Sequence, residues 1–337
     1  MKLKIAFVGF RHGHIFSLYD LVAKRVDFAI VGICEEDVEK SLLFMRPEIK
    51  VTDTNFEEML ERVDCDIVAI GDYYAKRGSL AIKALKAGKH IIVDKPLCTT
   101  LDEYGEIAAL AEEKNLKVGC MFELRSACEI IEARDLILSG ELGKIVQLQF
   151  SAQHPISLKT RPQWYFEDGK HGGTINDIAS HAIDIIPWMT GLEYKKIVAA
   201  RNWHALGMGS ESFRDAAQFM LELNNGCGVM GDVSYAATDA QKQQLPTYWR
   251  FTIWGTKGML EFRVGDDRLY LYKNDKECGS QIGFTRSKCV PTNEMDYLNS
   301  FIADINNKKV DLDTATVFAS VKKTLELQHF ADVAFSE

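Results

Sequence analysis

A lysine followed directly by a proline stands where a short apolar run ends, a position suited to work on a bound ligand. The run His90-Ile91-Ile92-Val93 predicts a buried parallel strand, and Asp94, Lys95 and Pro96 come next. Because open α/β sheets bind ligands at the carboxyl ends of their strands, Lys95 is expected at that edge, where it would orient or deprotonate a hydroxyl group. An exposed lysine at a strand end, with no catalytic role, fits the same residues.

A carboxylate and an imidazole four residues apart are a second group of candidate catalytic residues. Apolar residues recur at helical spacing through Thr174–Met189, and Asp177, His181 and Asp184 stand at i, i+4 and i+7, which predicts one shared helix face. Carboxylate beside imidazole is a ready acid–base pair, because histidine titrates near neutral pH. A surface helix with a polar stripe is the alternative interpretation.

The turn after the first apolar run is expected to bind a phosphate. Ile5–Val8 predicts the first strand, and Gly9-Phe10-Arg11-His12-Gly13-His14 then opens a helix. Glycines let backbone N–H groups approach a pyrophosphate, and the helix N-terminus adds a favourable partial charge. The dinucleotide pattern GxGxxG needs glycine at positions 9, 11 and 14, but Arg11 and His14 occupy two of these. An ordinary strand-to-helix turn is the alternative, and Arg11 would either obstruct a phosphate or pair with it.

An acidic residue, Glu35, follows the second predicted strand, Phe28–Cys34. A carboxylate about 20 residues past such a turn can accept a hydrogen bond from the adenosine ribose 2′-hydroxyl and repels a 2′-phosphate. This pattern therefore predicts NAD rather than NADP. A solvated acidic run before the next helix is the alternative.

Two patterns of elements divide the chain, so we predict domains at residues 1–123 and 124–337. Strand and helix patterns alternate in the first domain, which predicts a doubly wound parallel sheet. In the second, strands with period-two alternation are interrupted by one long helical pattern and followed by two closing helices, which predicts a mainly antiparallel α+β domain. Its predicted strands cover residues 145–153, 196–204, 217–223, 227–235, 248–254, 259–264 and 268–272.

Composition excludes several classes of protein. The 337 residues are 47% hydrophobic and 26% charged, with a net charge of −8, which is globular and argues against nucleic-acid binding. No apolar stretch approaches the ~18 residues of a membrane span, and the apolar start is too short for a secretory signal. The eight cysteines include no CxxC pair, so we expect reduced thiols, a cytoplasmic location and no metal site.

Taken together, these segments resemble the glucose–fructose oxidoreductase / inositol dehydrogenase (Gfo/Idh/MocA) family over essentially the whole chain. The family segment AGKHV…EKP is here Ala87-Gly88-Lys89-His90-Ile91-Ile92-Val93-Asp94-Lys95-Pro96, and a segment similar to GGxxxDxGxHxxD runs from Gly172 to Asp184. Arg125 falls where the family often carries an arginine at the domain junction. Arg161-Pro162-Gln163-Trp164 is also similar to the family.

The resemblance implies an N-terminal Rossmann domain and a C-terminal domain with a large open sheet, which often serves as an oligomer interface in a homodimer or homotetramer. It also implies hydride transfer between NAD(P) and a hydroxyl or keto carbon of a sugar or polyol. Carried over by position, Lys95 would polarise the reacting hydroxyl, His181 would take its proton, and Asp177 would bind the substrate and orient the site.

The motif positions also predict which residues contact the cofactor and the substrate. Cofactor contacts are expected from Gly9, Phe10, Arg11, His12, Gly13, His14, Glu35, Asp72, Tyr73, Asp94, Lys95 and Arg125. Substrate contacts are expected from His154, Arg161, Trp164 and Asp184, and from polar residues in the loop at 238–247. Trp164 would either stack on a sugar face or pack as a buried structural residue.

The chain departs from the family at several of these positions. Asp94 replaces the usual glutamate of EKP, Arg11 and His14 replace fingerprint glycines, and Ala179 replaces a common glycine. The family's TPN…H is here Asp72-Tyr73-Tyr74…Arg77, which introduces charge beside the expected nicotinamide.

Three functions are consistent with these residues, and an NAD-dependent dehydrogenase is the principal prediction. An NAD-retaining glycosidase or lyase, which oxidises a sugar carbon transiently, eliminates a substituent and re-reduces the product, would use the same apparatus. The irregular glycine turn favours a third function, a non-catalytic NAD-binding regulatory protein. The presence of Lys95, Asp177 and His181 together argues against that third function.

Overall fold

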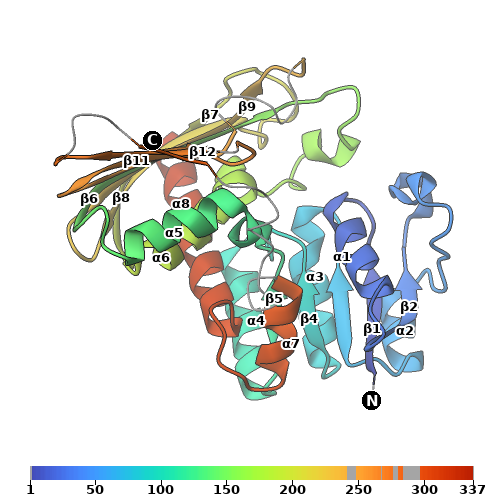
Figure 1. The fold of residues 1–337 in the computed structure, drawn as a ribbon. Coiled ribbons are helices and arrows are strands. Elements are labelled where there is room, and N and C mark those ends of the chain that lie inside the picture. The colour runs from blue at the N-terminus through green and yellow to red at the C-terminus, as the bar shows by residue number, and fades with distance from the viewer. Residues whose placement is uncertain (1, 241–247, 267, 276–279, 284–296, 337) are drawn as a thin grey trace. The chain divides into compact units, whose positions relative to one another are not determined.

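The computed structural model describes residues 2–240, 248–266, 268–275, 280–283 and 297–336, which form two compact units (Figure 1). Unit 1 comprises Met1–Met121, Pro162–Gly172 and Tyr297–Val321, and unit 2 comprises Phe122–Arg161, Gly173–Asp296 and Lys322–Glu337. The chain first passes from unit 1 to unit 2 after Met121. The division predicted from sequence, 1–123 and 124–337, does not assign residues 162–172 and 297–321 to unit 1.

Unit 1 is built on a five-stranded parallel sheet in the order β2-β1-β3-β4-β5, as the alternating patterns predicted. Strand order reverses between β1 and β3, and open α/β sheets bind ligands at the carboxyl ends of strands that flank such a reversal. The elements are β1 (Leu3–Val8), α1 (His14–Ala23), β2 (Phe28–Cys34), α2 (Phe56–Arg62), β3 (Ile67–Ile70), α3 (Tyr74–Lys86), β4 (His90–Val93), α4 (Leu101–Glu113), β5 (Val118–Cys120) and α7 (Tyr297–Ile305), with 3₁₀ turns at Val38–Lys40, Leu43–Met45 and Gln163–Phe166.

Local capping and packing fix these elements in unit 1. The Asn55 side chain accepts hydrogen bonds from the N–H groups of Glu57 and Glu58 in α2, and the Thr100 hydroxyl accepts one from the N–H of Glu103 in α4. Helix α7 packs on β5, where Gly119 makes room: a Cβ there would lie 2.9 Å from the Phe301 ring. Strands β3 and β4 are almost wholly buried, because parallel sheets of this kind carry helices on both faces.

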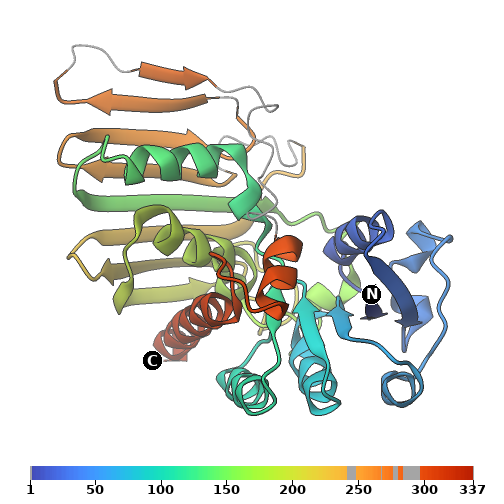
Figure 2. The same cartoon turned by 60° about the horizontal axis from the view of Figure 1, so that its bottom comes forward.

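Unit 2 is built on an eight-stranded sheet in the order β13-β12-β11-β10-β6-β9-β8-β7, in which only the described pair β6/β9 is parallel (Figure 2). This confirms the mainly antiparallel sheet, and β13 is a strand that the sequence patterns did not predict. The elements are a 3₁₀ turn at Glu123–Ser126 (η3), α5 (Cys128–Leu138), β6 (Ile145–Pro155), a π-helical turn at Ile175–Ala179 (η5), α6 (Ser180–Thr190), β7 (Tyr194–Trp203), β8 (Ala216–Leu223), β9 (Gly228–Ala237), β10 (Arg250–Gly255), β11 (Gly258–Arg263), β12 (Arg268–Lys273) and β13 (Ser280–Gly283), while α8 (Thr314–Ser336) passes into unit 2 at Lys322.

Helices cover one face of this large sheet. Helix α5 packs against α6 and against β11 and β12, and η5 packs against β9. Along β8 and β9 buried residues alternate with exposed ones, and the exposed ones include Met220 and Met230, each nearly half exposed. None of the described helices is long and apolar enough to cross a bilayer.

Candidate cofactor and catalytic residues

The turn after β1 contains two glycines with different surroundings. Gly9 has φ of +75°, and a Cβ there would lie 2.6 Å from Cβ of Asp72. Gly13 directly precedes α1, and a Cβ there would meet no atom within 4 Å. The first N–H groups of a helix have no partner inside the helix, so this end of α1 offers donors beside open space. These residues fit a pyrophosphate.

The Arg11 side chain extends from the turn toward the acidic residues that follow β2. Its Nε lies 3.5 Å from Glu35 Oε1, and its Nη2 lies 3.3 Å from Asp37 Oδ2. Glu35 is fully buried and accepts hydrogen bonds from the backbone N–H groups of Phe10, at 2.7 Å, and Asp37, at 3.0 Å. Burial raises the pKa of Glu35, and the two N–H groups offset part of that rise. Glu35 therefore holds the turn in place, and Glu36 and Asp37 are the carboxylates after this strand that solvent reaches.

Arg77 is fully buried and links the carboxyl ends of β3 and β4 by hydrogen bonds. This arginine was not among the site residues predicted from the sequence. Its guanidinium donates to the backbone carbonyls of Asp72, at 2.7 Å, Asp94, at 2.8 Å, and Lys95, at 2.5 Å. It also donates to the Asp94 carboxylate at 2.8 Å. The positive charge of Arg77, which the family pattern does not have at this position, is thus neutralised by Asp94 inside unit 1.

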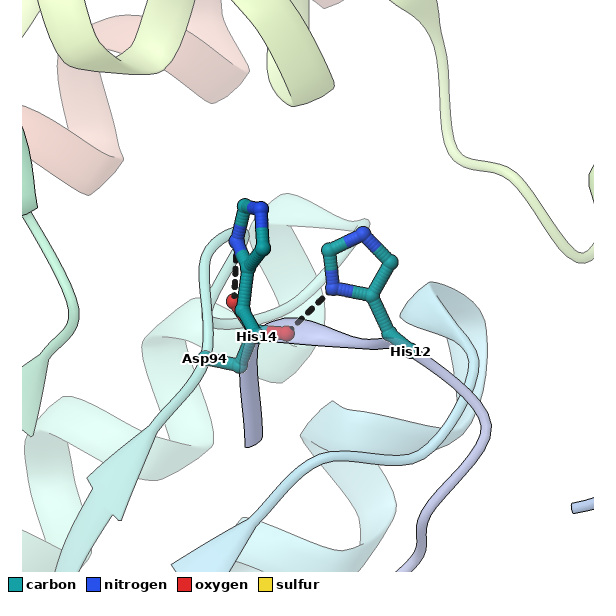
Figure 3. A group of neighbouring side chains, drawn as sticks. All are labelled: His12, His14 and Asp94. Atoms are coloured by element: carbon teal, nitrogen blue, oxygen red, sulfur yellow. Dashed lines mark hydrogen bonds and ion pairs between the residues drawn. The ribbon is translucent and has the colours of Figure 1, made fainter. Parts of the chain in front are cut away.

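Asp94 lies between the two histidines of the turn, His12 and His14 (Figure 3). Its Oδ2 lies 2.5 Å from Nδ1 of His12, and its Oδ1 lies 3.3 Å from Nδ1 of His14. Burial alone would raise the pKa of Asp94, but Arg77 and the two histidines hold it well below its usual value. Burial lowers the pKa of His12 to about 3, so this imidazole is neutral.

Aromatic side chains from residues 164–171 and from α3 cover this turn within unit 1. The Trp164 indole N–H donates to the Arg11 carbonyl at 3.0 Å, and the ring stacks on Tyr165 at 4.1 Å between centroids. The hydroxyl groups of Tyr165 and Tyr74 lie 2.7 Å apart. Trp164 is only 3% exposed, so the structure places it in a buried aromatic wall. The consecutive aromatics of 164–166 are the sequence signal for this wall.

The predicted lysine lies at the carboxyl end of β4. Lys95 is 5% exposed, and its carbonyl is held by Arg77. The Lys95–Pro96 peptide is cis. The neighbouring Asp72 bonds the N–H of Tyr73 at 2.7 Å and pairs with Lys76 at 3.2 Å.

In unit 2, Asp177 lies in a π-helical turn rather than in the regular helix that its spacing suggested. The Oε1 atom of Gln328, from α8, accepts hydrogen bonds from the N–H groups of Ile175, at 3.0 Å, and Asn176, at 3.2 Å. The Tyr235 hydroxyl donates to Asp177 Oδ2. Tyr235 was not predicted from sequence, because only the pairing of β9 with its neighbours brings it to η5.

His181 and Asp184 have different surroundings on α6. The His181 ring lies edge-on to Trp249 at 5.6 Å and to Phe122 at 6.2 Å, and it is 5% exposed. Asp184 forms a bidentate ion pair with Arg125: Nε and Nη2 of Arg125 each lie 2.7 Å from an oxygen of Asp184, and both side chains are buried. Asp184 and Arg125, predicted to contact substrate and cofactor respectively, thus pair with each other and join η3 to α6.

The two other predicted substrate residues of unit 2 gather around Tyr235. The Arg161 guanidinium lies 5.1 Å above the Tyr235 ring and donates to the carbonyls of Ile156, at 2.8 Å, and Pro155, at 2.7 Å. The His154 ring lies 6.4 Å from that of Tyr235 and 5.0 Å from that of Tyr248. Of the predicted loop at 238–247, residues 241–247 lie outside the described residues.

Comparison with known proteins identifies matches to both halves of the chain. Residues 3–122 match the model "Oxidoreductase family, NAD-binding Rossmann fold", and residues 130–261 match the "GFO/IDH/MocA C-terminal domain". The chain is 29% identical to 1,5-anhydro-D-fructose reductase of Ensifer adhaerens over 184 residues, which cover 54% of this chain and 50% of the relative. It is 26% identical to levoglucosan dehydrogenase of Pseudarthrobacter phenanthrenivorans over 234 residues, covering 62% of this chain and 58% of the relative.

A solved structure shows the same fold over the whole chain. The inositol dehydrogenase homologue of Azotobacter vinelandii, complexed with NADH and myo-inositol, superposes with a TM-score of 0.77 at 16% identity, covering 99% of this chain and 96% of that one. The matches to the curated relatives are shorter, since the chain spans only about half the length of the first of them.

Proposed function

The chain belongs to the Gfo/Idh/MocA family of oxidoreductases, with an NAD-binding Rossmann domain, and from this we propose that it is an NAD-dependent dehydrogenase acting on a sugar or polyol. The reaction moves a hydride between the nicotinamide and a hydroxyl or keto carbon. The observation that carries the proposal is Lys95, a lysine buried at the carboxyl end of β4, where open α/β sheets bind ligands.

The residues of the β1 turn fit the cofactor. NAD supplies the hydride acceptor when it is bound. Gly13 and the first N–H groups of α1 would receive the pyrophosphate, which the open space beside Gly13 supports. Glu35 holds Phe10 of the turn in place. Asp37, which pairs with Arg11 and Lys40, is the carboxylate proposed to contact the adenosine ribose.

Three side chains are the proposed catalytic residues. Lys95 orients the reacting hydroxyl, His181 accepts its proton, and Asp177 binds the substrate. The hydrogen bond from Tyr235 supports the role of Asp177, because it fixes the direction of the carboxylate. The aromatic rings around His181 support its role by excluding water from the imidazole.

A polyhydroxylated substrate suits the polar groups of unit 2. Asp177, Arg161 and His154 are hydrogen-bonding side chains gathered around Tyr235. The names of the curated relatives include a reductase of 1,5-anhydro-D-fructose and a dehydrogenase of levoglucosan, both carbohydrate derivatives.

The test is formation of NADH, followed at 340 nm, across a panel of sugars and polyols. We expect turnover with at least one of them and a loss of more than about 100-fold in kcat/KM for Lys95→Ala and for His181→Ala, since acid–base groups contribute 10²–10⁴-fold. Lys83→Ala, on the exposed side of α3, is the matched control and should keep full activity. Full turnover by both catalytic variants would refute the assignment. Cofactor that copurifies without exchanging would favour the redox-neutral lyase instead.

We also propose a cytoplasmic homodimer or homotetramer. The face of the unit 2 sheet that carries the exposed Met220 and Met230 supports self-association, because these side chains line a hollow together with Gln149, Gln218 and Asp232. Light scattering on the purified chain measures the assembly, and a monomer at micromolar concentration would contradict the proposal.

A further inference from the structure

We propose that His12, His14 and Asp94 bind a divalent transition-metal ion at the turn after β1. Each side chain offers one ligand atom, and these atoms lie within 4.8 Å of one another. Figure 3 shows both imidazole rings directed at the two oxygens of Asp94. The site goes beyond the proposed dehydrogenase activity, and it depends only on side chains of unit 1.

The spacing is close to that of a metal centre. Nδ1 of His12 lies 2.5 Å from one oxygen of Asp94, and Nδ1 of His14 lies 3.3 Å from the other. Zinc ligands at bond lengths of about 2.0–2.1 Å in a tetrahedral arrangement stand roughly 3.3 Å apart. Small side-chain rotations therefore convert the cluster into a coordination site.

The Asp94 carboxylate has one oxygen without a hydrogen bond. Asp94 Oδ1 is buried and makes no hydrogen bond to any described residue, although it faces His14 at 3.3 Å. Leaving a buried carboxylate oxygen without a hydrogen bond costs free energy. A cation between Oδ1 and the imidazole nitrogens removes that cost.

The groups around the cluster resemble the outer contacts of metal sites. Arg77 donates to the other oxygen of Asp94 at 2.8 Å, and this leaves Oδ1 directed at the ion. The Tyr74 hydroxyl lies 3.3 Å from Nε2 of His12 and 2.7 Å from the hydroxyl of Tyr165. Metal-binding histidines donate their second N–H to such a partner, and metal-binding carboxylates are themselves hydrogen-bonded.

The donor set selects the class of ion. Two imidazole nitrogens and one carboxylate oxygen suit Zn²⁺ or Fe²⁺, whereas Mg²⁺ and Ca²⁺ prefer oxygen ligands. Arg77 pairs with Asp94 Oδ2, so Oδ1 is the carboxylate oxygen that would join the two nitrogens as a ligand. The His14 side chain is 37% exposed, although its Nδ1 atom is buried, so water or a ligand oxygen would reach the ion past this ring to complete the coordination.

The test is a Co²⁺ titration of the full chain after treatment with EDTA and desalting, because Co²⁺ reports its ligands by visible absorption. We expect one Co²⁺ per chain, displaced by Zn²⁺ and not by Mg²⁺. His14→Ala and Asp94→Asn should each weaken binding by more than about 100-fold, since even outer contacts contribute 10–100-fold. His329→Ala, an exposed histidine on α8, is the control that should bind as the unsubstituted chain does.

Failure of the unsubstituted chain to bind Co²⁺ or Zn²⁺ would overturn the proposal, and so would binding that survives both substitutions. Thermal unfolding of each variant checks that it folds. Paramagnetically shifted imidazole N–H signals in the NMR spectrum of the cobalt protein provide a readout that needs no variant, and their absence would also refute the site. None of these readouts depends on NADH formation, so the metal site and the dehydrogenase proposal can fail separately.

Discussion

At the scale of single residues, burial decides which cysteines can react. Cys34 is fully buried, and burial together with Glu36 and Asp53 raises its thiol pKa to about 12. At pH 8 roughly one molecule in ten thousand then carries the thiolate, the form that reacts with alkylating reagents. Cys128 is the described cysteine that is not buried.

We therefore predict that iodoacetamide at pH 8 labels Cys128 and leaves Cys34 unmodified, as measured by peptide mass spectrometry. Labelling of Cys34 should rise about tenfold per pH unit, because the thiolate fraction rises in that proportion below the pKa. Unfolding in urea should expose Cys34 at pH 8 and serves as the positive control. Equal labelling of the two residues in the folded chain would contradict the burial of Cys34.

The sequence indicated which residues could belong to the site, but it did not indicate their hydrogen-bond and ion-pair partners. His12 and Asp94 are 82 positions apart, and only the parallel pairing of β1, β3 and β4 brings them to hydrogen-bond distance. A search for cysteine ligands therefore predicted no metal site. Arg125 and Asp184 each carried a predicted site role, and the sequence did not show that they would neutralise each other.

At the scale of elements, the turn after β1 tests how backbone conformation limits substitution. Gly9 and Gly88 have nearly the same φ, +75° and +74°, but a Cβ at position 9 would lie 2.7 Å from the backbone N of Asp72, whereas one at position 88 meets nothing. The positive φ costs an L-residue about 1–2 kcal/mol, and overpacking adds about 1–3 kcal/mol.

Gly9→Ala should therefore lower the free energy of unfolding by roughly 2–5 kcal/mol, against about 1–2 kcal/mol for Gly88→Ala. Urea unfolding of both variants measures the difference. We also expect Gly9→Ala to lose NAD binding, because the displaced Asp72 segment adjoins the turn. Equal losses of stability in the two variants would contradict the prediction, because they would show that the Asp72 backbone can shift away from a Cβ at position 9 without lowering the free energy of unfolding.

Hydrophobic periodicity predicted the strands well, because each buried run needs little information beyond its own residues. Phe28–Cys34 and His90–Val93 were predicted with the bounds that β2 and β4 have. The π-helical turn Ile175–Ala179 was not foreseen, since its geometry depends on Gln328 from α8. Strand β13 was missed because its four residues carry too short a pattern.

At the scale of the whole molecule, unit 1 draws on three separated stretches of chain. Phe301 packs on Gly119, and the Thr314 hydroxyl accepts a hydrogen bond from the N–H of Val118 at 3.0 Å. Trp164 bonds the Arg11 carbonyl. Each contact covers the parallel sheet or its ligand edge with residues that lie beyond position 123.

We predict that residues 1–123 alone do not fold cooperatively, because truncation exposes β5 and removes the aromatic cover of the turn. Circular dichroism should show a broad thermal transition, and the fragment should bind a dye specific for exposed apolar surface. Joining residues 297–321 to the fragment through a flexible linker should restore a sharper transition. The same linked fragment carrying Phe301→Asp is the matched control and should not restore it, because the charge would be buried against β5. A sharp transition for the unlinked fragment would show that the N-terminal stretch is an independent domain.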